Sequence, residues 1–277
     1  NVDDARLSEV LQRAESANEG APITFFEITT AAAFLLFSEV PADLLVLETG
    51  LGGRLDATNV VDRPLASVIT TIGFDHMGFL GNSLAEIATE KAGIIKREVP
   101  VIAAPQKSEA AAVIERHAAR NRAPLVMGGT EWTVVPEHGR LVFQDTDGLM
   151  DLPAPRLDGR HQYVNAGVAI ATMRTTRLVT DPAAIEAGIT GAQWPGRLQR
   201  LTKGRLLEFA PAEAEIWLDG GHNADAGDVI ATAMADLEER VSRPLFLVAG
   251  MLATKDPAAY FRAFGGLARH VFTVRVP

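Results

Sequence analysis

The sequence predicts an α/β protein with a mostly parallel sheet in a first, larger domain and a smaller domain of the same class behind it. Three observations predict this class. Short apolar segments alternate with helix-like segments along most of the chain, which is typical of a parallel sheet covered by helices. The alternation stops in one segment that contains proline and glycine and then restarts. The length of 277 residues also fits two domains.

The first elements are expected to be helices. Apolar residues recur at helical spacing over residues 3–16, and the strongly apolar segment 31–37 is typical of a buried helix. Thr24 and Glu27 have the spacing of a capping box just ahead of that segment. The second helix should therefore begin close to them.

The larger domain continues with alternating elements. Strands are expected over residues 43–48, 66–73, 99–104 and 124–127, with helices that begin at residue 83 and cover 108–120. Because strands alternate with helices, the sheet should be parallel and covered on both faces. Residues 131–136 and 140–144 flank a His-Gly turn and predict an antiparallel hairpin, which a helix over 161–178 follows.

The segment 180–199 holds two prolines and three glycines, and we expect the domain boundary in it, with domains 1–188 and 189–277. The alternation restarts after this segment. Strands are expected over residues 214–219, 244–250 and 270–275, with helices over 224–240 and 256–265. This order predicts a small Rossmann-like domain.

Composition excludes several classes of function. The chain has 26 basic and 35 acidic residues, a net charge of -9, which argues against broad attraction to nucleic acid or anionic membrane and leaves a local basic pocket open. It has no cysteine, so disulfides and thiolate metal sites are excluded, and a cytoplasmic enzyme fits. No apolar run approaches the ~20 residues of a membrane span.

Two strand ends in the larger domain carry polar side chains that a buried strand does not otherwise need. One expected strand ends on Glu48, and the next leads into His76. Ligands of open parallel sheets bind at such ends, and a carboxylate with an imidazole suits Mg²⁺ or Mn²⁺. The glycines of 50–54 would allow close approach to a phosphate. Alternatively, Glu48 caps the next turn and His76 is a solvated loop residue.

Lys91 falls on the apolar face of the helix expected after residue 83. Leu84, Ile87 and Ala88 define this face, and Lys91 follows Leu84 by seven residues. A lysine in this position either extends its ammonium group to the surface or has a changed charge state. Close to a metal and phosphate site, such a lysine is also open to chemical modification.

The smaller domain has a polar strand end of its own at Asp219, which two glycines, His222 and Asn223 follow. An acidic residue after a nucleotide-binding strand can accept a hydrogen bond from a ribose hydroxyl. The alternative is a simple turn in which Asn223 caps the next helix. Arg197 follows a Pro-Gly turn and suits a phosphate or adenine contact, and Lys255 follows the next expected strand.

Six motifs occur in one order along nearly the whole chain: ETGLGGRLDATN, TIGFDH, EKAGIIK, GRHQYVNA, WPGRLQ and DGGHNADAG. Together they resemble the folylpolyglutamate synthase/dihydrofolate synthase family of the Mur-ligase superfamily. The resemblance implies a Mur-ligase central domain, ATPase-like, and a Mur-ligase C-terminal domain. Family members use ATP to join the amine of glutamate to a carboxylate of a folate-type substrate. An acyl phosphate forms first, and glutamate displaces its phosphate.

The resemblance implies a metal site with three contributors. Glu48 matches a Mg²⁺ ligand and His76 matches the residue that holds a second Mg²⁺, with K⁺ as a further cation to consider. Lys91 matches a carbamylated lysine of the family. Carbamylation makes a cation into an anion that supports metal binding.

The resemblance also assigns residues to the reacting molecules. Asn165, Arg197 and Asp219 match positions that hold ATP. His222 matches a histidine near the phosphates and the incoming amino acid, and Lys255 is grouped with it as a catalytic residue.

Phe25, Glu27 and Asp75 are candidate contacts of the folate-type substrate. The implied partners are small molecules: dihydropteroate or reduced folates, L-glutamate and ATP. No nucleic acid or membrane partner is expected, and the protein is expected to be a cytoplasmic monomer.

One family feature is missing from the sequence. The family's phosphate loop has the pattern G-x-x-x-x-G-K-[ST], and the chain contains no Gly-Lys pair. A serine metal ligand on a following loop is missing as well. We therefore expect an incomplete chain, which lacks the phosphate-loop part on its N-terminal side and part of the second domain on its C-terminal side.

The predicted function is that of an ATP-dependent ligase that joins L-glutamate to dihydropteroate, to reduced folates or to both. A rival is another Mur-type ligase that adds amino acids to a cell-wall precursor, but GRLDATNV together with GRHQYVNA favours the folate branch. A second rival is a degenerate member that binds nucleotide without ligating, which the missing phosphate loop supports.

Overall fold

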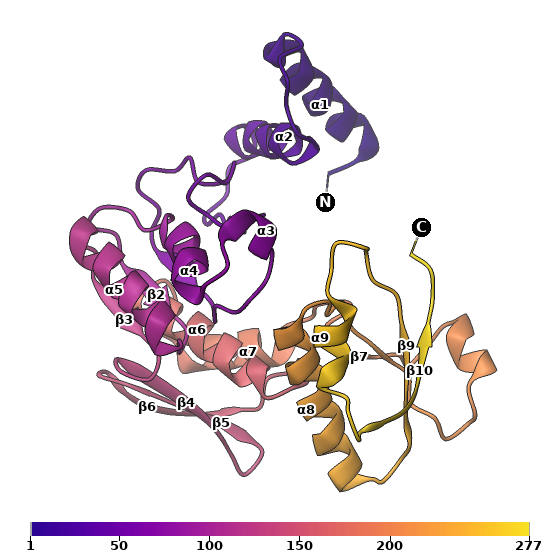
Figure 1. The fold of residues 1–277 in the computed structure, drawn as a ribbon. Helices are drawn as coiled ribbons and strands as arrows, with labels where there is room; N and C mark the ends of the chain where they lie inside the picture. The colour runs from indigo at the N-terminus through magenta and orange to yellow at the C-terminus, as the bar shows by residue number, and fades with distance from the viewer. Residues whose placement is uncertain (1, 277) are drawn as a thin grey trace.

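The computed structural model describes residues 2–276 and confirms the predicted α/β class (Figure 1). The helices are α1 (Asp4–Asn18), α2 (Phe25–Glu39), α3 (Met77–Leu80), α4 (Leu84–Ala92), α5 (Ser108–Asn121), α6 (His161–Thr176), α7 (Pro182–Gly191), α8 (Ala224–Arg240) and α9 (Pro257–Arg262), with a 3₁₀ turn η1 at Arg205–Phe209. The strands are β1 (Ser67–Ile69), β2 (Val101–Ala103), β3 (Leu125–Met127), β4 (Trp132–Glu137), β5 (Arg140–Asp145), β6 (Gly148–Pro153), β7 (Gln199–Arg200), β8 (Trp217–Leu218), β9 (Leu245–Ala249) and β10 (Ala268–Thr273).

The central sheet is parallel, with the strand order β1-β2-β3. Alternate residues of β2 serve opposite faces because side chains alternate along a strand. Val101 and Ala103 pack with α4 and α5, whereas Ile102 packs with α6. Both faces are therefore covered, as the sequence predicts.

The antiparallel excursion contains the predicted hairpin, β4 with β5, and a third strand, β6, that the pattern analysis missed. Thr146 and Asp147 form the turn before β6, and Gly148, the first residue of β6, has a positive φ of 117°. The sheet packs on α6 and α7, and the rings of Trp132 and Phe143 stack in the shared core at 5.8 Å between centroids.

The strand expected over residues 43–48 does not form, so this prediction is wrong. A strand requires a hydrogen-bonded neighbour, and nothing within residues 2–276 pairs with this segment. Its apolar side chains are open to solvent, Val46 to 83%. Glu48 consequently lies on an exposed, irregular segment rather than at the end of a core strand.

In the smaller unit, β9 and β10 pair in parallel and pack on α8 and α9. The strand expected at 214–219 shrinks to β8, which pairs antiparallel with β7. Figure 1 shows α8 and α9 on the side of the β9–β10 sheet that faces the larger unit.

Helix α7 occupies half of the segment 180–199, in which the domain boundary is expected. Ile185 and Ile189 of α7 pack in the core of the antiparallel sheet and α6. A division between residues 188 and 189 would cut this helix, so the position of the boundary stays a prediction.

Helices α1 and α2 pack on each other around Val10, Ala14 and Ala32, and they lie at one extremity of the molecule in Figure 1. The capping box predicted for α2 is confirmed in both directions between Thr24 and Glu27. No helix within residues 2–276 has the length and apolar character needed to cross a membrane.

Candidate functional site

The carboxylate of Asp75 joins the two units of the chain. It accepts a hydrogen bond from Asn223 Nδ2 at 2.8 Å and one from Lys255 Nζ at 3.0 Å. The Nε2 atoms of His76 and His222 each lie 3.7 Å from the same carboxylate. Asp75 and His76 come from the larger unit and the other three residues from the smaller one, so the cluster is built across the unit boundary.

The electrostatics of the cluster favour a charged Asp75. Partial burial alone would raise the pKa of this carboxyl, but the hydrogen bonds from Asn223 and Lys255 outweigh burial and lower the pKa to about 2. Lys255 is mostly buried, with 15% of its side chain accessible. The cluster therefore holds a fixed negative and a fixed positive charge in contact.

The strand ends explain how the cluster forms. Asp75 follows β1, the stretch with His222 and Asn223 follows β8, and Lys255 follows β9. All three are carboxyl ends, and those of β1 and β9 belong to parallel sheets, whose ligands bind at this end. Gly73 is required by this convergence, because a Cβ on it would overlap the carboxylate of Asp225 at the start of α8.

Lys91 lies on the buried side of α4, as its position in the apolar pattern predicts. Burial lowers the pKa of its amine, and the negative charge of Asp75 raises it in part. A lowered pKa increases the fraction of neutral amine, which is the form that reacts with carbon dioxide. The carbamylation of Lys91 stays a prediction that this environment supports.

The glycine-rich loop packs closely against the C-terminal end of α4 and is hydrogen-bonded to it. A Cβ on Gly53, whose φ is 153°, would lie 3.1 Å from Glu90 O and 3.2 Å from Lys91 O. Arg54 N donates to Glu90 O at 2.8 Å, and the Arg54 guanidinium binds the Glu90 carboxylate. The close approach that these glycines allow is thus to the end of the helix that carries Lys91.

Asp56 closes the same loop. Its carboxylate accepts hydrogen bonds from Gly50 N, Leu51 N and Thr58. Burial raises the pKa of Asp56, and these bonds outweigh it to give a lowered pKa. The loop therefore has an internal structure that fixes its shape.

The predicted Mg²⁺ ligands, Glu48 and His76, are accessible, but they do not belong to a cluster of protein side chains that could coordinate a metal ion by itself. Glu48 and His76 are both exposed, and within residues 2–276 no group of three or more His, Cys, Asp or Glu side chains could hold a metal ion. Mg²⁺ in phosphoryl-transfer sites usually binds one or two protein ligands, with waters and phosphates as the others. The oxygen and nitrogen donors fit that mode, and both assignments stay predictions.

The residues predicted to hold ATP lie in and beside the smaller unit. Asp219 accepts from Leu198 N at 2.7 Å and from Gly221 N at 2.6 Å, so it shapes the turn after β8. A Cβ on Gly220 would lie 3.5 Å from Arg197 Nη1. Asn165 is exposed on α6. Their roles toward ATP stay predictions.

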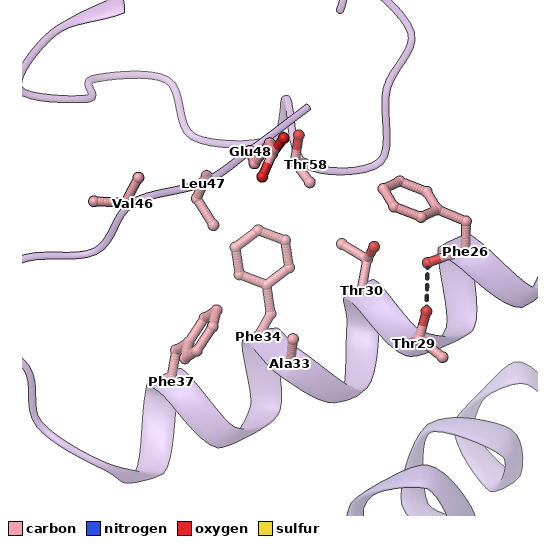
Figure 2. A pocket seen from close by; sticks show the side chains of 10 residues that line it. All are labelled: Phe26, Thr29, Thr30, Ala33, Phe34, Phe37, Val46, Leu47, Glu48 and Thr58. Carbon is pink, nitrogen blue, oxygen red and sulfur yellow. Dashed lines mark hydrogen bonds between the residues drawn. The ribbon is translucent and has the colours of Figure 1, made fainter. Parts of the chain in front are cut away.

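A hollow of about 220 Å³ separates α2 from the irregular segment around Glu48 (Figure 2). Phe26, Phe34 and Phe37 of α2 turn their rings toward it, and Glu48 faces them from the other side. The hollow is lined by Phe26, Thr29, Thr30, Ala33, Phe34, Phe37, Val46, Leu47, Glu48 and Thr58.

The candidate substrate residues of α2 do not line this hollow. Phe25 is not among the lining residues, and 84% of its surface is exposed. Glu27 is held in the capping box, where bonds from the Thr24 side chain and backbone lower its pKa. Phe26, which the sequence analysis did not single out, takes the position between α2 and Gly50.

Two further residues of the site region were missed. Asn223 was assigned only a capping role, and it performs that role toward Ala226 N while it also binds Asp75. His161 is part of the GRHQYVNA motif and lies close enough to Asp219 and Arg197 for both to affect its pKa. Membership of a motif was the available signal for each.

No protein-family model matches the chain. Among curated proteins, it is 33% identical to folylpolyglutamate synthase of Lacticaseibacillus casei over 99% of this chain and 63% of that protein. It is 38% identical to dihydrofolate synthase/folylpolyglutamate synthase of Bacillus subtilis over 76% of this chain and 49% of that protein. The chain thus spans about half to two thirds of the length of these relatives.

Solved structures agree with the sequence comparison. The apo form of L. casei FPGS aligns with all of this chain and 67% of its own, at 31% identity and a TM-score of 0.81. The chain belongs to the folylpolyglutamate synthase/dihydrofolate synthase family. The structure of E. coli FolC in complex with DHPP and ADP aligns at 31% identity and a TM-score of 0.86, over 98% of this chain and 61% of that one.

Proposed function

We propose that the protein of which this chain is the described part is an ATP-dependent ligase that joins L-glutamate to dihydropteroate or to reduced folates. The relatives are named for these two activities, and the E. coli relative was solved with DHPP and ADP. Those names and ligands belong to the relatives. They support the proposal because the chain aligns with them over nearly all of its length.

The observation that carries the proposal is the cluster around Asp75. A ligase of this kind must bring a nucleotide, an acid and an amine together, and motifs from both units meet at this one carboxylate. Lys255 is held by Asp75 with its side chain largely shielded from solvent. A fixed positive charge of this kind stabilises negative charge that develops on a transferred phosphoryl group.

The proposed chemistry has two steps. The substrate carboxylate attacks the γ-phosphorus of ATP, the bond to the β-phosphate oxygen breaks, and ADP leaves. The amine of glutamate then attacks the acyl carbon, loses a proton, and phosphate leaves with the electrons of the broken C–O bond. His222 lies exposed beside Asp75, and its imidazole is of a type that suits proton transfer near neutral pH. His76, the other imidazole of the cluster, is the proposed Mg²⁺ ligand.

Glu48 and His76 would hold Mg²⁺, which supplies charge neutralisation for the phosphates when it is bound. Lys91, once carbamylated, would add a carboxylate-like anion on the side of the site nearest Asp75. The buried amine and the loop that grips α4 favour this role.

The test is an assay of the full-length protein for ADP release that requires glutamate, with dihydropteroate and a reduced folate as alternative acids. We expect ADP release with at least one of the two acids and none without glutamate. Nucleotide binding without any such turnover would instead support the non-catalytic alternative. Turnover with a cell-wall precursor and not with either pterin acid would support the other Mur-type ligase.

A further inference from the structure

The first turn of α6 contains a chain of three polar side chains that the proposed reaction does not use in full. Asn165 Nδ2 donates to Gln162 Oε1 at 3.1 Å. Gln162 Nε2 lies 3.0 Å from His161 Nε2. The exposed end of this chain is Asn165, a predicted ATP contact, and the inner end is an imidazole.

This series of hydrogen-bonded side chains is largely buried. Gln162 is only 6% exposed, and both ends of its amide have a partner. The His161 ring is packed against Gly159, where a Cβ would lie 2.7 Å from Nδ1, and Leu198 borders the same space. Within residues 2–276, His161 Nδ1 is buried without a hydrogen-bond partner.

The direction of the bonds follows from Gln162. Its oxygen accepts from Asn165, so its amino group must face His161. In this arrangement His161 Nε2 is the acceptor, which requires the tautomer with its proton on Nδ1. Because the Asn165 amino group donates to Gln162, its Oδ1 is the atom left to accept from a ligand, and Asn165 is exposed.

The imidazole lies near two residues that are predicted to hold ATP, Asp219 and Arg197. Asp219 and Arg197 both act on the His161 ring, and Asp219 binds the backbone of Leu198, which borders the ring. His161 itself is turned inward by this packing. It can therefore act on a nucleotide only through Gln162 and Asn165.

We propose that His161 is a positioning residue of the nucleotide site, which through Gln162 holds the Asn165 amide with its oxygen toward the base and so selects a purine with a 6-amino group. The proposal rests on the ATP use of the proposed function. An amide oxygen accepts from the 6-amino group of adenine, whereas the 6-oxo group of hypoxanthine offers only an acceptor.

The first test reads the tautomer directly. In the full-length protein, ¹⁵N NMR of the His161 ring should show a protonated Nδ1 and an unprotonated Nε2 at neutral pH. A proton on Nε2 would reverse the donor and acceptor in both hydrogen bonds and would leave the Asn165 amino group, not its oxygen, free for a ligand. This result would overturn the proposal.

The second test compares binding of ATP and inosine triphosphate by titration calorimetry without acid substrate or glutamate, so that no turnover is needed. We expect His161→Leu to lower the preference for ATP about tenfold, the size of one hydrogen bond. His161→Gln is the matched variant, because its amide oxygen can accept from Gln162 near the place of Nε2. It should keep the preference within about threefold of wild type.

The outcomes separate a positioning role from a structural one. If His161→Leu weakened the binding of ATP and of inosine triphosphate equally, the positioning role would be excluded. It would also be excluded if His161→Gln lost the preference for ATP as His161→Leu does while its melting temperature stayed unchanged. If wild type preferred ATP as expected but released no ADP with glutamate, the proposed ligase function would fail while His161 kept its role.

Discussion

At the scale of single residues, burial changes what an amine can do, and Lys91 is the clearest case. Its pKa is lowered by burial in an apolar face, although Asp75 acts in the opposite direction. The sequence predicts this position from spacing alone, because hydrophobic periodicity depends only on nearby residues. It predicts Asp75 as a substrate contact and not as the carboxylate around which the site is assembled. The reason is that its hydrogen-bond partners Asn223 and Lys255 are 148 and 180 residues away in the sequence.

We expect the Lys91 amine to be carbamylated in the intact protein, with Lys91→Ala losing most ligase activity and a short carboxylate restoring part of it. Mass measurement at alkaline pH with labelled bicarbonate checks the modification. Lys107→Ala is the control, because Lys107 is exposed at the start of α5. A fully active protein with an unmodified Lys91 would contradict the assignment.

At the scale of elements, helix starts are the most predictable features and the segment 43–48 is the least. The capping box predicted ahead of α2 is confirmed, and α4 begins after residue 83 as expected, because a cap is a contact between residues three apart. A strand requires a partner from elsewhere in the chain, so an apolar run such as 43–48 cannot establish one by itself.

The glycine-rich loop gives a prediction at this scale. Gly53→Ala should destabilise the protein by roughly 1–3 kcal/mol, because the added Cβ would press on Ile94 and on the carbonyl groups at the end of α4. Thermal unfolding measures this change. Gly188→Ala is the matched control, since Gly188 lies in α7 with open space around it and should gain up to ~1 kcal/mol.

A shared loss of stability in the two glycine variants would mean that any added methyl is harmful here. An unchanged Gly53→Ala would show that the loop can move away from α4, and that it does not position Lys91.

At the scale of the whole molecule, the two units are joined through Asp75, and the pKa of this residue links their association to pH. Its folded pKa of about 2 lies below the ordinary 3.8. The stabilisation is therefore complete above pH 3.8 and disappears as the pH falls toward 2.

We expect Asp75→Asn to lower the melting temperature at pH 5 and to differ less and less from wild type as the pH approaches 2. Thermal unfolding between pH 2 and 5 measures this difference. Asp151→Asn is the control, because Asp151 forms an exposed ion pair with Arg140 on the antiparallel sheet, and such pairs contribute little. A difference between Asp75→Asn and wild type that stayed constant with pH would exclude the charge of Asp75 as the link.

The separation of Asp75 from Lys255 along the chain also has a consequence for synthesis on the ribosome. Their contact joins residues 180 positions apart. At ~5–20 residues per second, the carboxylate is made roughly 9–36 s before its ammonium partner. The larger unit can bury its own core during this interval, but the nascent protein has no assembled site. A ligand of the proposed site that reaches the chain early would therefore meet only the half that the larger unit supplies.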